Sequence, residues 1–170
     1  MTDKDLYGVI ILIGMPGSGK TTLGKLLAEK LDYRFLDTDQ LISLETGKTP
    51  PQLVEERGRE YFLSVQDQVI LSIHQSGSVI STGGGLVHSK TAMQHLKSLG
   101  FVVYLNTGYP IIEQRMEPSR KLVRKNGTLL DLYNERVPLY NQYADTVLNC
   151  DNTEPELLCD KLVKMVRSSR

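Results

Sequence analysis

The sequence predicts an α/β fold in three layers, with a five-stranded parallel sheet flanked by helices. Three observations lead to this prediction. Five short segments are rich in β-branched and aromatic residues, helix-like segments alternate with them, and a glycine-rich loop joins the first such segment to the first helix. Strands buried on both faces of a parallel sheet read as short continuous apolar runs, and right-handed crossovers connect them.

The first predicted strand, residues 8–14, reads GVIILIG and is bounded by glycine. Weaker runs of the same kind predict four more strands, at residues 33–37, 78–83, 100–106 and 145–149. Apolar residues recur at intervals of three and four elsewhere, which predicts helices at residues 20–31, 59–75, 91–99 and 152–166. The last helix opens with a capping-box pattern formed by Thr153 and Glu156.

The length and charge of the chain limit its function. With 170 residues it is expected to fold as one domain, residues 1–170. Its 20 basic and 20 acidic side chains give a formal net charge of zero, so we expect a small-molecule substrate and no nucleic-acid partner. No segment reaches the roughly 18 apolar residues of a membrane span, and Cys150 and Cys159 lack metal-ligand spacing. We therefore expect a soluble, cytoplasmic monomer without a membrane partner.

Residues 116–127, MEPSRKLVRKNG, interrupt the alternation of strands and helices. Pro118 and Gly127 flank four basic residues, and the segment is long and basic for a connector. We expect it to form part of a lid that covers about residues 112–127.

The strongest motif is GMPGSGKT, residues 14–21, which matches G-x-x-x-x-G-K-[ST] between a predicted strand and a predicted helix. The glycines allow successive backbone N–H groups to converge on phosphate oxygens, and the positive end of the helix dipole faces the same charge. Lys20 is expected to reach the β- and γ-phosphates, and Thr21 to offer its hydroxyl to Mg²⁺. The nucleotide-binding residues expected in and after this loop are Gly14, Gly17, Ser18, Gly19, Lys20, Thr21 and Thr22.

Two further patterns lie at predicted strand ends, where open α/β sheets bind ligands. Asp37 and Asp39 are two residues apart, and on a strand such side chains face the same way. One carboxylate would support magnesium and the other would accept a proton from an attacking hydroxyl or orient it, whereas a helix N-cap or exposed turn would explain the pair without function. Gly83, Gly84 and Gly85 indicate close approach of the main chain to a ligand, a strained turn, or a flexible surface loop.

Taken in order and at these separations, GMPGSGKT, LDTD, TGGG, SRKLV and ERVPLY resemble the shikimate kinase family from Val9 to about Pro155. The resemblance implies a nucleoside monophosphate kinase-like fold whose lid closes over ATP. It also implies transfer of the γ-phosphoryl group of ATP to the 3-hydroxyl of shikimate, in aromatic amino acid biosynthesis. In this reading Asp39 binds ring hydroxyls and acts as base, Asp37 assists Mg²⁺ through water, and residues 83–85 lie against the substrate.

The resemblance also assigns roles to three arginines. Arg120 corresponds to the lid arginine that meets the transferring phosphoryl group, although Lys121 stands where the family has proline. Arg136 corresponds to an arginine that binds the shikimate carboxylate, and Arg115 resembles the arginine that packs on adenine. Pro155 is the best match to the adenine-side loop. Each arginine could instead be a solvated surface residue.

One family motif, G-E-x-x-F-R-x-x-E, is altered in this chain. Residues 58–66 read GREYFLSVQ, so Leu63 and Gln66 stand where the family has arginine and glutamate, in the substrate site. The loss of both is physically coherent, because a glutamate without its arginine would be an unpaired buried carboxylate. Arg59 lies one turn earlier on the same helix face, where it would either reach toward the missing arginine's position or stay solvated.

Three hypotheses about function remain open from the sequence. The first is a shikimate kinase that binds the acid through Arg136 and Arg59. The second is a kinase of the same fold for another small polyol or acid, with an uncharged group near Leu63. The third is a non-catalytic nucleotide-binding regulator, against which the presence of Asp39 and Arg120 argues, because a protein that only binds a nucleotide needs neither a base nor a lid arginine. The histidines at 74, 88 and 95 show no catalytic pattern and are expected to be structural or surface residues.

Overall fold

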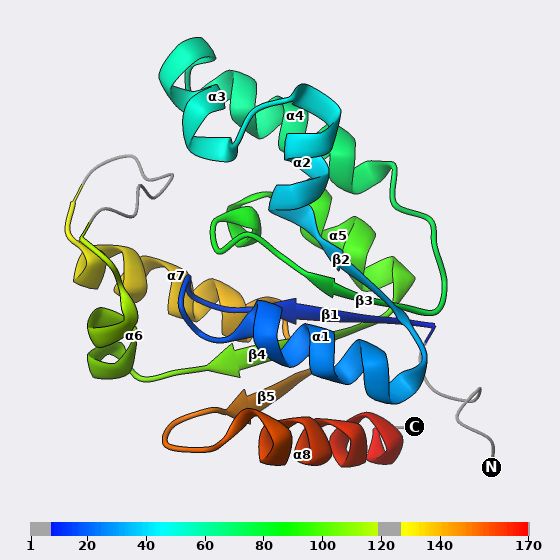
Figure 1. Cartoon of the computed structure of the whole chain (residues 1–170). Coiled ribbons are helices and arrows are strands. Elements are labelled where there is room, and N and C mark those ends of the chain that lie inside the picture. The colour runs from blue at the N-terminus through cyan, green and yellow to red at the C-terminus, as the bar shows by residue number, and fades with distance from the viewer. Residues whose placement is uncertain (1–7, 119–126, 170) are drawn as a thin grey trace.

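The computed structural model describes residues 8–118 and 127–169. These residues form a five-stranded sheet in the order β2-β3-β1-β4-β5, and each neighbouring pair is parallel (Figure 1). The strands are β1 (Val9–Ile13), β2 (Arg34–Asp37), β3 (Ser78–Ser81), β4 (Phe101–Asn106) and β5 (Thr146–Asn149). The predicted parallel sheet is confirmed, and all five strands lie inside the predicted segments.

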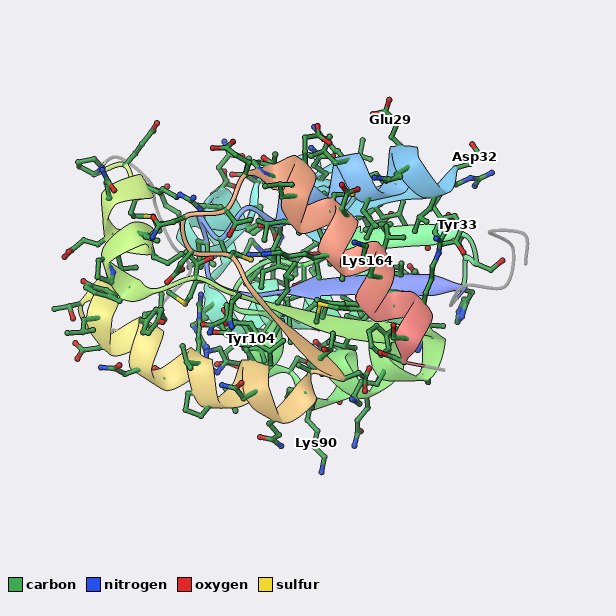
Figure 2. The ribbon with its side chains drawn as sticks, turned by 90° about the horizontal axis from the view of Figure 1, so that it is seen from below. Glu29, Asp32, Tyr33, Lys90, Tyr104 and Lys164 are labelled. Atoms are coloured by element: carbon green, nitrogen blue, oxygen red, sulfur yellow. The ribbon has the colours of Figure 1, made fainter. Side chains whose placement is uncertain are left out.

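Helices connect the strands and cover both faces of the sheet. They are α1 (Lys20–Leu31), α2 (Thr38–Thr46), α3 (Pro50–Arg57), α4 (Arg59–Leu71), α5 (Lys90–Leu99), α6 (Tyr109–Arg115), α7 (Leu129–Tyr143) and α8 (Pro155–Ser168), with a short 3₁₀ turn, η2 (Leu86–His88). In Figure 2, Glu29 of α1 and Lys90 of α5 lie on opposite sides of the sheet. Helices α1 and α8 cover one face and α5 and α7 the other, while α2, α3 and α4 extend beyond β2 (Figure 1).

The central strand β1 separates two apolar clusters, because successive side chains of a strand point to opposite faces. Ile10 and Leu12 pack into the α1–α8 cluster, whereas Ile11 and Ile13 pack into the cluster under α5 and α7. All four side chains are at most 1% exposed. Burial on both faces explains why this segment reads as an unbroken apolar run.

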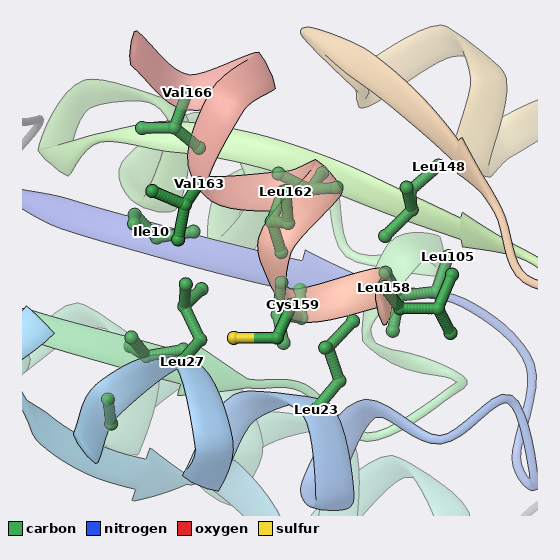
Figure 3. Close-up of a cluster of buried hydrophobic side chains, with 14 of the residues drawn as sticks. Ile10, Leu23, Leu27, Leu105, Leu148, Leu158, Cys159, Leu162, Val163 and Val166 are labelled. Carbon is green, nitrogen blue, oxygen red and sulfur yellow. The ribbon is translucent and has the colours of Figure 1, made fainter. Parts of the chain in front are cut away.

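In the α1–α8 cluster, Leu23 and Leu27 of α1 face Leu158, Cys159 and Leu162 of α8 (Figure 3). A third cluster lies away from the sheet, among α2, α3 and α4. It consists of Ile42, Leu53, Phe62, Val65 and Val69. This α2–α4 cluster gives the three helices a core of their own.

Four helices, α2, α3, α6 and α7, were not predicted. Two of them carried a local signal, since Thr49 and Gln52 form a capping box at α3, and Thr128 and Asp131 form one at α7. Pro138 lies inside α7, and an interior proline normally argues against a helix.

The capping box predicted for the last helix is wrong. Helix α8 has Glu154 as its N-cap without a side-chain cap, and Pro155 occupies the first turn. The Thr153 hydroxyl donates instead to the carbonyl oxygen of Asp151, at 3.1 Å.

The expected lid is described only in part. Residues 112–115 belong to α6, whereas residues 119–126 lie outside the described residues. Among the helices of the described part of the chain, none is long and apolar enough to cross a membrane.

We expect Leu27→Ala to lower the free energy of unfolding by about 2–5 kcal/mol, because it leaves a cavity where the side chain is fully buried. The measurement is urea denaturation. Leu44→Ala is the matched control, since Leu44 is 82% exposed and its truncation should change stability by less than about 0.5 kcal/mol. Equal effects of the two substitutions would contradict the assignment of Leu27 to the core.

Candidate active site

A cavity of about 1140 Å³ lies at the carboxyl ends of the strands, bounded by the segments that follow β1, β2 and β3. Strand β1 lies between β3 and β4, so the connections that leave β1 and β3 diverge to opposite sides of it. Such a switch point is where open parallel sheets bind ligands. Pockets for a single small ligand typically measure about 300–1,000 Å³, so this cavity has room for a nucleotide and a small second ligand.

The glycines of the loop at residues 14–21 are needed for its backbone geometry. Gly14, Gly17 and Gly19 have φ values of 152°, 80° and 91°, which side chains disfavour. A Cβ atom on Gly14 would also lie 2.8 Å from the carbonyl oxygen of Leu105. The loop ends at Lys20, the first residue of α1, so the helix N-terminus faces the cavity as predicted.

Lys20 lies across its own loop. Its ammonium donates to the carbonyl oxygens of Gly14 and Met15, at 2.8 and 2.7 Å, and the residue is 7% exposed. The charge is therefore held at the floor of the loop, where a phosphate group would be bound by the backbone N–H groups.

Asp37 joins the loop to the next strand. Its Oδ1 accepts from the backbone N–H groups of Asp39 and Gln40, at 2.9 and 3.1 Å, and thereby caps α2. Its Oδ2 accepts from the Thr21 hydroxyl at 3.5 Å. The N-cap role and a role beside the phosphate loop are therefore compatible, because one oxygen of the Asp37 carboxylate caps α2 and the other faces Thr21.

The prediction that Asp37 and Asp39 share one strand face is wrong. Asp37 ends β2, whereas Asp39 lies in the first turn of α2 and reaches the cavity from the helix. Between them, the Thr38 hydroxyl accepts from the backbone N–H of Gly83 at 2.9 Å. A Cβ atom on Gly83 would lie only 2.6 Å from Asp39 Oδ1. The Asp39 carboxylate therefore lies directly against the glycine loop.

Gly84 and Gly85 of the glycine loop do not have a positive φ, so steric crowding, not left-handed backbone, explains why glycine stands at these positions. A Cβ atom on Gly84 would lie 2.7 Å from Pro16, and one on Gly85 would lie 3.0 Å from Arg136 Nη2. Neither a strained turn nor a flexible loop describes residues 83–85.

Tyr140 anchors the part of α7 that carries Arg136. The Tyr140 hydroxyl donates to the carbonyl oxygen of Gly84 at 2.7 Å, and its ring stacks on Tyr104 with centroids 5.1 Å apart. Arg136 lies one turn earlier on the same face of α7, is 3% exposed, and borders the cavity. Burial lowers the pKa of Arg136, but a guanidinium stays protonated in proteins, so a buried positive charge faces the cavity.

At the other end of the cavity, Arg115 donates from Nη1 to the carbonyl oxygen of Gly17, at 3.1 Å. Cys150, Pro155 and Leu158 also line this end. Burial raises the pKa of Cys150 to about 11, so its thiol is neutral at neutral pH. The predicted residues Arg115 and Pro155 thus border a largely uncharged surface beside the phosphate loop.

Leu63 and Gln66 both line the cavity and also belong to a packed helix. Leu63 is half-buried and packs against the α2–α4 cluster, while Gln66 is 4% exposed. Arg59 borders the same part of the cavity from the first turn of α4.

His88, expected to be structural or on the surface, instead lines the cavity. Its Nε2 lies 3.6 Å from Oε1 of Glu135. Burial, and secondarily the charge of Arg136, lowers the pKa of His88, so the imidazole is neutral at neutral pH. The sequence signal for this position was that His88 follows the glycine loop by three residues, which places it near the same strand end. Arg120, the predicted lid arginine, lies outside the described residues.

Comparison with known proteins identifies the family of this chain. A family model described as shikimate kinase matches residues 16–167. The chain belongs to the shikimate kinase family. It is therefore a phosphotransferase that acts on a hydroxyl group.

Individual relatives span nearly the whole chain. The chain is 35% identical to the shikimate kinase of Hahella chejuensis over 167 residues, which cover 95% of this chain and 87% of the relative. The solved structure of shikimate kinase from Acinetobacter baumannii in complex with shikimate is similar with a TM-score of 0.88 and 32% identity, covering 96% of this chain and 95% of that one. The Aquifex aeolicus shikimate kinase gives a TM-score of 0.82 at 30% identity, over 94% and 96% of the two chains.

We expect Gly83→Ala to reduce phosphotransferase activity about 100-fold, because the added methyl group would displace the Asp39 carboxylate, and misplacement by about 1 Å has effects of this size. Steady-state kinetics measures the loss. Gly8→Ala is the control, since its Cβ atom would meet only Ser76, at 3.7 Å. Full activity of Gly83→Ala would show that the contact between the glycine loop and Asp39 is unimportant.

Proposed function

We propose that this protein transfers the γ-phosphoryl group of ATP to the 3-hydroxyl of shikimate. The observation that carries the proposal is that one cavity contains the phosphate loop, the Asp39 carboxylate and the buried Arg136 guanidinium. These are the parts needed to hold a triphosphate, an attacking hydroxyl and a carboxylate. The likeness to a shikimate kinase solved in complex with shikimate supports the choice of acceptor.

In this proposal ATP occupies the end of the cavity next to α1. The backbone N–H groups of residues 14–21 bind phosphate oxygens, and the Lys20 ammonium exchanges loop carbonyls for the β- and γ-phosphates. Arg115 and Pro155 border the adenine. Arg120 retains its expected role at the transferring phosphoryl group, as part of a lid over about residues 112–127 in a single-domain chain.

The residues beside the phosphate loop suit Mg²⁺. This ion prefers oxygen ligands and usually takes one or two from the protein, with phosphate and water completing its shell. Thr21 and Asp37 offer two oxygens 3.5 Å apart, and the described residues contain no cluster of three or more His, Cys, Asp or Glu side chains that would indicate another metal. We assign the Thr21 hydroxyl as ligand and the Asp37 carboxylate as support through water. When bound, the ion would neutralise charge on the β- and γ-phosphates.

Asp39 and Arg136 would act on the acceptor. Phosphoryl transfer depends mainly on positioning and charge neutralisation. Asp39, held against Gly83, would orient the attacking hydroxyl and accept its proton. Arg136, held by the turn that ends in Tyr140, would bind the acceptor carboxylate in the bidentate geometry that guanidinium allows.

One observation favours a second candidate, phosphorylation of an uncharged polyol by the same machinery. Leu63 presents an apolar side chain to the cavity, and Gln66 presents an uncharged one. For either acceptor we infer a cytoplasmic enzyme, and the two free, buried cysteines, Cys150 and Cys159, agree with a reducing compartment.

With ATP and Mg²⁺, we expect shikimate to support rapid ADP release in a coupled assay, while uncharged polyols of the same size do not.

Asp39→Asn should lower kcat at least about 100-fold, because the hydroxyl loses its proton acceptor. Asp32→Asn is the control, since Asp32 is exposed and caps α1 outside the cavity. Turnover of a polyol in preference to shikimate would select the second candidate.

Removal of divalent ions should abolish the activity, and Mg²⁺ should restore it. Thr21→Val keeps the shape of the side chain but removes its hydroxyl, so we expect half-maximal activity to need at least about tenfold more Mg²⁺. Thr91→Val is the matched control at an exposed position of α5. The same Mg²⁺ dependence in Thr21→Val and wild type would contradict the assigned ligand.

A further inference from the structure

Two polar groups on α4 lack hydrogen-bond partners where α4 borders the cavity. Arg59 Nε and Gln66 Nε2 are both buried, and neither has a partner among the described residues. Both residues line the cavity, and Gln66 is 4% exposed. Buried polar groups in folded proteins are nearly always paired, so these two donors indicate a ligand that accepts hydrogen bonds.

The charges around this part of the cavity indicate the sign of that ligand. Burial is the main cause that lowers the pKa of Arg136 and the pKa of His88. The positive charge of Arg59 is a smaller contribution in the same direction for both groups. Arg59 and Arg136 also line the same cavity, so two guanidinium groups border one space. The nearby acid, Glu135, has a side chain that is 62% exposed and contacts His88. An anion between the two guanidinium groups would relieve their repulsion.

Helix geometry explains why Arg59 is available for this role. Residues 59, 63 and 66 lie on one face of α4 in successive turns. Helical side chains lean toward the N-terminus, so a residue at 63 covers the surface above the turn that carries Arg59. Leu63 is short and packs against the α2–α4 cluster. Leu63 therefore places no charged group in the part of the cavity that Arg59 also borders.

We propose that Arg59 is a specificity-determining residue that binds the carboxylate of a small polyhydroxy acid together with Arg136, and that Gln66 donates to the same acceptor. The inference rests on the proposed kinase function and names the residues that select its acceptor. Arg59 offers several N–H donors in a planar fork that matches a carboxylate. The neutral amide of Gln66 can donate to a carboxylate or hydroxyl oxygen without competing for either guanidinium, as an acidic side chain there would.

The test compares Arg59→Met with Arg57→Met in the full-length protein. Loss of one partner of a buried charge pair weakens binding at least about 30-fold, so we expect KM for shikimate to rise by at least that factor in Arg59→Met, with KM for ATP unchanged. Arg57 is exposed, lies over the ring of Tyr61 at 4.3 Å and does not line the cavity, so Arg57→Met controls for loss of charge.

Two further measurements separate recognition from misfolding. Wild type should prefer shikimate to its carboxamide analogue, and Arg59→Met should lose most of this preference while still accepting the carboxamide. Gln66→Leu should raise KM for shikimate about tenfold, the usual effect of losing a hydrogen bond to a charged group. Moving the charge, in the double variant Arg59→Leu/Leu63→Arg, should recover most of the preference for the acid.

The outcomes distinguish this inference from the proposed function. If wild type phosphorylates shikimate and Arg59→Met has an unchanged KM, the kinase assignment stands and the role of Arg59 is wrong. If another polyhydroxy acid is the better substrate and its KM depends on Arg59, the role of Arg59 stands and the named acceptor is wrong. If only uncharged polyols are phosphorylated, both are wrong.

Discussion

The position of β1 at the centre of a parallel sheet is the constraint on which the whole site depends. Because β3 and β4 flank it and all strands run in one direction, the segments that follow β1, β2 and β3 emerge together at one edge. Gly14 allows β1 to turn there beside the Leu105 carbonyl, where a larger residue would collide. The sheet therefore brings the phosphate loop, Asp39 and the glycine loop together before any contact among their side chains forms.

Much of this arrangement could be predicted, because it depends on residues close together in the chain. The phosphate loop and the helix that follows it are specified by local glycine geometry and apolar spacing. The sequence of helix α7 gives conflicting local signals, since a capping box marks its start but its interior Pro138 opposes helix formation. The packing of Leu132 and Tyr140, which are 5% and 1% exposed, outweighs that cost, and packing of this kind joins segments far apart in the sequence.

The limits of prediction at the site have the same origin. The family motif correctly places Leu63 and Gln66 at the substrate site, but helical spacing does not reveal that His88 lines the same cavity. Asp37 illustrates the converse error. The strand period ends at Asp37, where the chain changes from β2 to α2, so the two carboxylates reach the cavity from different elements.

The separate core of α2, α3 and α4 has a consequence for one wall of the cavity. Asp39, Arg59 and Gln66 all belong to this unit, whereas Lys20 and Arg136 are carried by helices that pack on the sheet. Substitutions within residues 38–71 can thus change one wall of the cavity without repacking the helix that follows the phosphate loop. Leu63 and Gln66, which stand where the family motif has arginine and glutamate, belong to this separate unit, so changes at these positions leave the packing of α1 and α7 on the sheet intact.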